Sequence, residues 1–129
     1  MIKRSFLSLV LVAALSIAAL APAQAQDVTN EDALIILAQW EQVKWGTISG
    51  CWSAGWLWGG SPSACMSQTF TSIYASAVSE YQSVTATILN CALTGNEACV
   101  EYWGQIGLAW TYVAEDIEAG AQIYGYSYL

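Results

Sequence analysis

The chain has 129 residues, with ten acidic residues, three basic residues and no histidine. Two of the bases lie within the first four residues, so Lys44 is the only cation in the rest of the chain. A chain with so few cations cannot neutralise nucleic-acid phosphates, and it has no electrostatic attraction to anionic lipid. The composition therefore excludes nucleic acid as a ligand and favours a neutral ligand or a basic partner.

The first 25 residues have the layout of a secretory signal peptide. Two basic residues precede a mostly apolar run over residues 6–21, Pro22 ends the run, and Ala23-Gln24-Ala25 gives a small-x-small cleavage pattern. An uncleaved membrane anchor is the alternative, although the run is short for a span. We predict a signal peptide over residues 1–25 and a single domain over residues 26–129, periplasmic or secreted.

The segment from Asn30 to about Ile48 has the pattern of a helix, and Thr29 is a candidate for its N-cap. The apolar side chains that recur there in steps of three and four are Ala33, Ile36, Leu37, Trp40 and Val43. A second helix is predicted to start at the Ser61-Pro62 pair and to end at Cys91.

The serine- and threonine-rich stretch between Ser79 and Thr87 forms helix weakly, so we expect a bend or break there. A strand over residues 84–89 is the competing interpretation. A third helix is predicted to follow the Thr94-Gly95-Asn96 turn and to end at Gly120. The tail over residues 123–129 alternates tyrosine with small residues, which indicates an extended segment or a loose end.

Four cysteines follow the predicted cleavage site, and an even count in a small exported domain indicates two disulfides. Three helices with short connections favour an all-α, up-down-up bundle. In this topology Cys51 and Cys65 meet at one pole, and Cys91 and Cys99 meet at the other. Any other pairing would have to span a helix length, so we predict Cys51–Cys65 and Cys91–Cys99. Without histidine or a Cys-x-x-Cys pair, we predict no metal and no cofactor.

One pole of this bundle gathers aromatic and acidic side chains. It holds the glycine-rich stretch between Cys51 and Cys65, the end of the third helix and the tail. The binding residues predicted there are Trp52, Trp56, Trp58, Glu115, Asp116, Glu118, Tyr124 and Tyr126. Each group also has a structural interpretation: the tryptophans cap the core, the carboxylates form a solvated face, and the tail is disordered.

The sequence argues against an enzyme. Histidine is absent, the cysteines are predicted to be paired, and no spacing of acids specifies the carboxylate pair of a glycoside hydrolase. We therefore predict a non-catalytic, exported binding module whose acidic, aromatic pole engages a partner protein, for which a basic partner is favoured. The alternatives are binding of a carbohydrate or cell-wall glycan through the tryptophan stretch, and a self-assembling structural or surface protein that forms a homo-oligomer.

Overall fold

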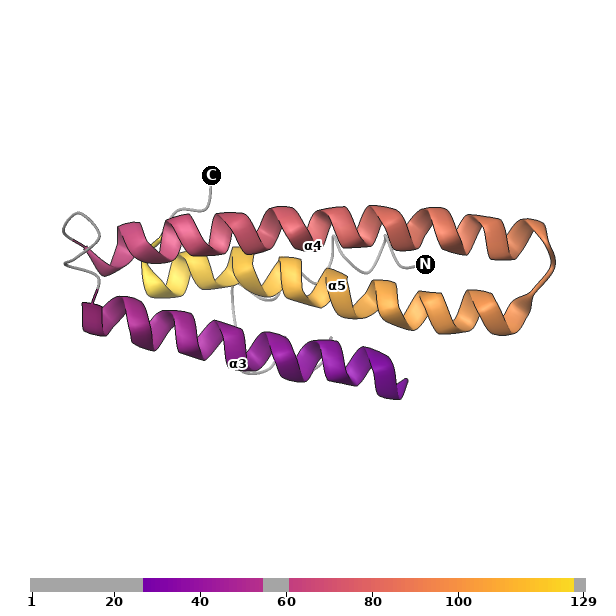
Figure 1. Cartoon of the computed structure of the whole chain (residues 1–129), viewed down its shortest axis with the longest axis horizontal. Helices are drawn as coiled ribbons and strands as arrows, with labels where there is room; N and C mark the ends of the chain where they lie inside the picture. Colours follow the sequence, from indigo (N-terminus) through magenta and orange to yellow (C-terminus); the bar gives the residue numbers. More distant parts are fainter. Residues whose placement is uncertain (1–26, 55–60, 127–129) are drawn as a thin grey trace.

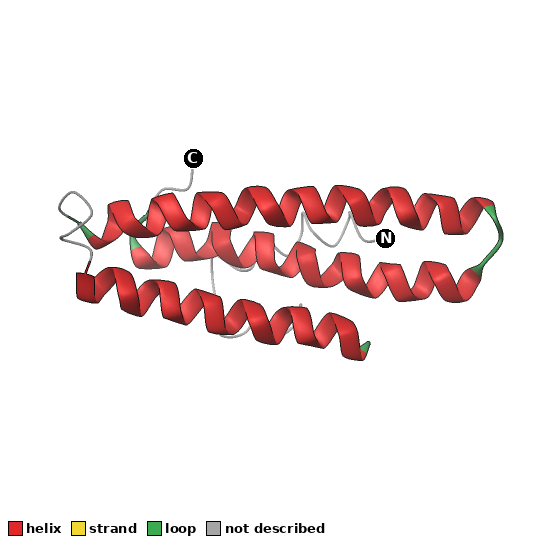
Figure 2. Ribbon diagram, viewed as in Figure 1, coloured by secondary structure: helices red, strands yellow, loops and turns green. Residues whose placement is uncertain are grey.

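The computed structural model describes residues 27–54 and 61–126. This part of the chain forms the helices α3 (Glu31–Ala54), α4 (Pro62–Leu93) and α5 (Glu97–Tyr124). They run up, down and up beside one another, and α4 and α5 extend past the start of α3 (Figure 1). The described residues contain no strand (Figure 2). The predicted all-α, three-helix bundle is therefore confirmed.

Both predicted disulfides are present. Cys51 is bonded to Cys65 and Cys91 to Cys99, with a Cα–Cα distance of 5.6 Å in each pair. By restricting the unfolded chain, bridges that close such short segments each stabilise a fold by about 2–3 kcal/mol. Two disulfides are compatible with an oxidising, extracellular environment.

The helices α4 and α5 begin where their capping residues predict. The Ser61 side chain accepts a hydrogen bond from the Ala64 N–H at 3.0 Å, and Pro62 is the first helical residue. The Asn96 side chain accepts from the Cys99 N–H at 3.1 Å at the start of α5. Each cap provides a partner for an N–H group that has none within the helix, so these two boundaries follow from local sequence.

The predicted boundaries of α3 need correction at both ends. Asn30, not Thr29, is the cap, because its side-chain oxygen accepts from the N–H groups two and three residues later. The helix also continues past Ile48 for six residues, to Ala54. Ile48 and Cys51 are both buried, and this packing holds the last turns helical despite two nearby glycines.

The expected break in α4 is wrong, because the helix is continuous from Pro62 to Leu93. The hydroxyls of Thr85 and Thr87 donate to backbone carbonyls four residues earlier in the same helix, at 2.9 and 3.1 Å. Both hydroxyls therefore bond within the helix instead of supporting a turn or a strand. Val84 of the same segment is buried, and tertiary packing outweighs the weak propensity of the stretch.

The expected end of α5 at Gly120 is also wrong, because the helix continues to Tyr124. It is closed by Gly125, whose φ of 76° is in the left-handed region. Gly120 has a different role: a Cβ atom added there would lie 2.8 Å from the hydroxyl oxygen of Tyr126. That hydroxyl donates to the Ile117 carbonyl at 2.8 Å, so the chain after α5 folds back onto the helix.

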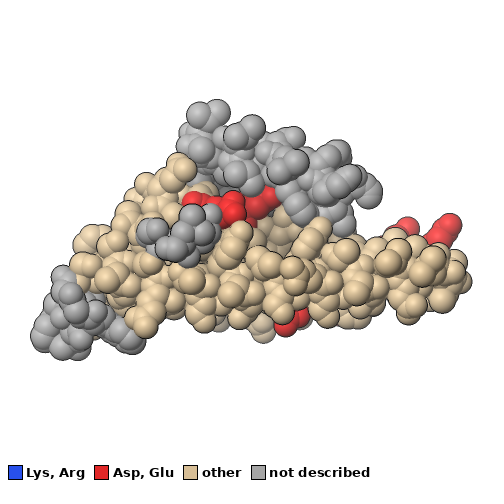
Figure 3. All heavy atoms as spheres, turned by 90° about the horizontal axis from the view of Figure 1, so that it is seen from above, with Lys and Arg blue, Asp and Glu red and all other residues tan. Residues whose placement is uncertain are grey.

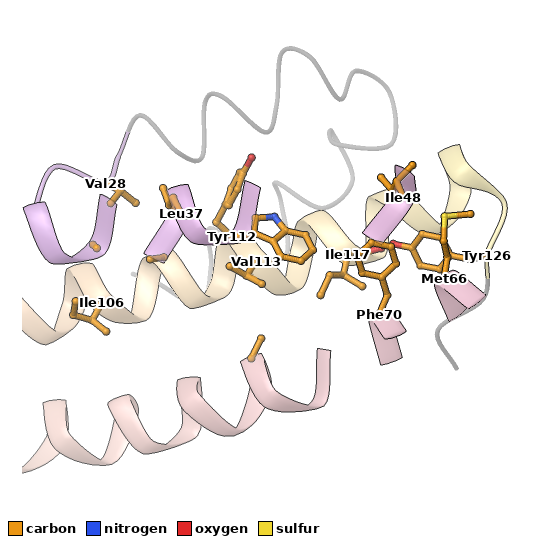
Figure 4. Packing of buried hydrophobic residues seen from close by; sticks show 14 of the residues in the cluster. Val28, Leu37, Ile48, Met66, Phe70, Ile106, Tyr112, Val113, Ile117 and Tyr126 are labelled. Atoms are coloured by element: carbon orange, nitrogen blue, oxygen red, sulfur yellow. The ribbon is translucent and has the colours of Figure 1, made fainter. Parts of the chain in front are cut away.

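The centre of the core lies in the half of the bundle nearer the Cys51–Cys65 disulfide. The largest fully buried side chains are Phe70, Met66, Ile117 and Val113. Figure 4 shows the Tyr126 ring packed among them, stacked on Phe70 with ring centroids 4.8 Å apart. Within the described residues, no helix is both long and apolar enough to cross a membrane.

Candidate functional site

A pocket of about 60 Å³ opens between α3 and α5, in the half of the bundle nearer the Cys51–Cys65 disulfide. Ile48, Phe70 and Tyr126, which lie close together in Figure 4, form its inner wall. The side chains that give it chemical character are Trp40, Lys44 and Trp45 from α3, with Asp116, Ile123 and Tyr124 from α5. The pocket is therefore mostly aromatic and aliphatic, with one ammonium and one carboxylate in its lining.

A buried ion pair forms the polar side of the pocket. The Lys44 Nζ lies 2.7 Å from Asp116 Oδ2 and 3.1 Å from Glu41 Oε2, and the side chains of Lys44 and Asp116 are only 13% and 6% exposed. The indole N–H of Trp40 also donates to Asp116 Oδ2, at 2.9 Å. Burial acts to lower the pKa of Lys44, but hydrogen bonds and attraction from the two carboxylates outweigh it and raise this pKa. The ammonium therefore stays charged at neutral pH.

The ring of Trp45 is held in one orientation beside this pair. Its indole N–H donates to Glu41 Oε1 at 3.1 Å, and the Lys44 ammonium lies 5.3 Å from its ring centroid. The ring of Tyr124 meets it edge-on, with centroids 5.9 Å apart. Even so, Trp45 remains 50% exposed. A large ring fixed by its neighbours but half open to solvent is a preorganised contact surface.

The predicted aromatic residues have different surroundings. Trp52 lies in the last turn of α3, not in a loop, and is 61% exposed. Trp56 and Trp58 lie outside the described residues. Tyr124 and Tyr126 both line the pocket, and Tyr126 also belongs to the core and is only 5% exposed.

The three predicted carboxylates do not form one acidic surface. Asp116 is buried in the ion pair with Lys44, and Glu118 accepts a hydrogen bond from the Tyr74 hydroxyl at 3.0 Å. Glu115 is half-buried, and this burial, together with the nearby charge of Glu118, raises its pKa to about 8. Each carboxylate therefore has its own structural environment.

Three residues of the pocket are not among the predicted site residues: Trp40, Lys44 and Trp45. A local signal for them exists, because Trp40 and Lys44, and likewise Glu41 and Trp45, are four residues apart and so share a helix face. Asp116, which completes the ion pair, is 72 residues away from Lys44 in the chain. Only the packing of α3 against α5 brings them together.

The face seen in Figure 3 carries scattered acidic side chains and is otherwise mostly uncharged. Within residues 27–54 and 61–126, no three cysteine, aspartate or glutamate side chains are grouped so as to hold a metal ion. No protein-family model, curated protein or solved structure matches the chain.

Proposed function

We propose that the protein is an exported, non-catalytic binding module that holds a neutral carbohydrate chain against the ring of Trp45. The observation that carries this proposal is a fixed, half-exposed indole directly beside the paired polar groups of Lys44, Glu41 and Asp116. A sugar ring presents apolar C–H groups on its faces and hydroxyls around its edge. A site that binds it therefore needs an apolar platform with a few fixed polar groups, and this pocket combines both.

The charges around the pocket support a neutral ligand. Lys44 carries one positive charge, and Glu41 and Asp116 together carry two negative charges, so the local sum is about −1. Residues 27–129 contain ten acids and one base, a formal balance of one minus ten, or −9. An anionic glycan would be repelled by both the site and the protein as a whole. An uncharged chain avoids this repulsion.

Export is supported by two independent features. The first 25 residues have the pattern of a secretory signal peptide, and both disulfides suit an oxidising compartment. We propose a periplasmic or secreted location on this basis.

The absence of catalysis is also part of the proposal. The two carboxylates beside the pocket already accept hydrogen bonds from Lys44, Trp40 and Trp45. Such bonds orient the carboxylates and hold the rings in place. This arrangement supports a structural role for both acids.

The test is a titration of the mature protein with the neutral β-linked glucose trimer. Calorimetry and tryptophan fluorescence measure the binding. We expect saturable binding that changes little between 50 and 500 mM salt, because no phosphate or carboxylate is neutralised. Trp45→Ala should weaken this binding at least tenfold. Trp52→Ala is the matched control, since Trp52 lies on the same helix but does not line the pocket.

The comparison is valid only if Trp45→Ala and Trp52→Ala both keep the helical circular-dichroism spectrum of the wild type. If the wild-type protein binds neither this trimer nor a neutral trimer that carries acetamido groups, the carbohydrate proposal is wrong. Equal loss of binding in the two variants would place the sugar elsewhere on the aromatic pole.

A partner protein is the second candidate ligand, and the exposure of Trp52 favours it. This side chain is 61% exposed and lies two helical turns beyond Trp45 on the same side of α3. Exposed tryptophans are frequent anchors of protein interfaces. In a pull-down from envelope and secreted fractions, a protein retained by the wild type and lost with Trp52→Ala would support this candidate. Retention of the same protein by both baits would contradict it.

A further inference from the structure

The pocket beside Trp45 is large enough for a small substituent but not for a whole sugar ring. Its volume is about 60 Å³, well below the volume of about 150 Å³ of a protein cavity that accepts a benzene ring. The pocket is therefore too small for a six-membered ring and suits a group of a few heavy atoms. A group that enters it while the sugar ring lies on Trp45 must be compact.

One N–H group of the Lys44 ammonium has no acceptor among the described residues. An ammonium carries three N–H groups, and within the described chain Lys44 donates to two acceptors, Glu41 and Asp116. A purely apolar group in the pocket would shield the third N–H from water without giving it a partner. The entering group should therefore carry an acceptor oxygen.

The carboxylates add a complementary requirement. Asp116 Oδ2 accepts from Trp40 and Lys44, and a carboxylate has about four acceptor positions in total, so a donor on the ligand can still be accommodated. An anionic group would be repelled by Asp116 and Glu41, and a cationic group that entered the pocket would compete with Lys44 for the same two carboxylates. The polar part of the entering group should therefore be neutral, with both an acceptor and a donor.

The remaining lining is apolar. Ile48, Phe70 and Ile123 lie around the pocket, and contact with these side chains favours a methyl group. A substituent of about four heavy atoms with a carbonyl, an N–H and a methyl group satisfies all of these requirements. That substituent is the acetamido group.

We propose that this pocket is the subsite for the acetamido group of an N-acetylated amino sugar whose ring lies against Trp45. The carbonyl oxygen accepts from Lys44, the N–H faces the carboxylates, and the methyl group packs against Ile48 and Ile123. This inference rests on the proposed carbohydrate function and narrows it to a class of sugar.

The experiment compares two neutral trisaccharides on the mature protein. One is the β-1,4-linked trimer of N-acetylglucosamine, and the other is the β-1,4-linked glucose trimer, which has a hydroxyl in place of each acetamido group. We expect the acetylated trimer to bind at least tenfold more tightly. Ile123→Phe is the specific variant, because the larger side chain of this half-exposed residue narrows the pocket while leaving the Trp45 ring in place.

We expect Ile123→Phe to bind the two trimers equally and Trp45→Ala to bind neither. Trp52→Ala should behave like the wild type. Equal affinity of the wild type for both trimers would overturn the acetamido subsite while leaving carbohydrate binding intact. Binding of neither trimer would overturn both proposals. An undiminished preference for the acetylated trimer in Ile123→Phe would show that the acetamido group binds outside this pocket.

Discussion

Replacing Lys44 with methionine tests whether the ion pair beside the pocket is a structural element. The substitution keeps a flexible chain of similar length but removes the ammonium 2.7 Å from Asp116. In this variant the Asp116 carboxylate would still accept from the Trp40 N–H, but no positive charge would neutralise it. Asp116 is only 8% exposed, so water would not compensate for that loss. Removing one member of a buried ion pair costs about 3–5 kcal/mol, because the remaining charge is left without compensation.

For Lys44→Met we expect a loss of about 3 kcal/mol in the free energy of unfolding, the lower end of that range. The Trp40 hydrogen bond offsets part of the penalty. For a domain of this size, such a loss lowers the melting temperature by about 12–24 °C. Urea unfolding followed by tryptophan fluorescence, with both disulfides intact, measures the free energy directly.

The double variant Lys44→Met with Asp116→Asn separates charge from packing. An asparagine side chain retains a carbonyl oxygen that can accept from Trp40, and it carries no charge. We expect the double variant to recover most of the loss seen in Lys44→Met. If Lys44→Met alone costs less than about 1 kcal/mol, the pair contributes no more than an exposed ion pair, and the assignment of a buried, structural pair is refuted.

Two further predictions concern stability. Gly104→Ala should stabilise the protein by about 0.5–1 kcal/mol, because a Cβ atom there meets nothing within 4 Å. Gly107→Ala should be at least about 1 kcal/mol less stable than that variant, because its Cβ atom would lie 3.2 Å from a methyl group of Val84. Equal urea midpoints for the two variants would contradict this difference. The pKa of Glu115 is raised to about 8 from a usual value of 4.5, so the folded state favours the protonated acid. The resulting stability is present below pH 4.5 and is lost as the pH rises toward 8. Glu115→Gln should flatten this pH dependence of the urea midpoint, and an unchanged slope would show that Glu115 is solvated.

The helix starts and the disulfide pairing were predictable because they depend on neighbouring residues. A cap acts on N–H groups within the next three residues, so Ser61 and Asn96 identify two helix starts without knowledge of the fold. Each disulfide closes a short connection between consecutive helices, with sequence separations of 14 and 8 residues. Once three helices alternate in direction, only this pairing brings the sulfur atoms together.

The errors arose where packing outweighs local preference. The serine- and threonine-rich segment of α4 stays helical because Val84 is buried between neighbours. The helix α5 passes Gly120, which is buried and leaves room for the Tyr126 hydroxyl, and it ends instead at Gly125. As isolated peptides, both segments would form helix more weakly. In the folded protein, packing against the neighbouring element keeps them helical.

The amino-acid sequence alone is enough to predict an acidic protein without histidine, with three helices and with cysteines paired across each connection. It also indicated the end of the molecule where aromatic residues gather. Which of these aromatic residues form a site depends on how the helices pack. Lys44 and Asp116 are 72 residues apart in the chain, and Trp45 and Tyr124 lie on different helices. Periodicity shows which side of a helix is covered, but it does not show which residue of another helix covers it, because that depends on the register of α3 against α5.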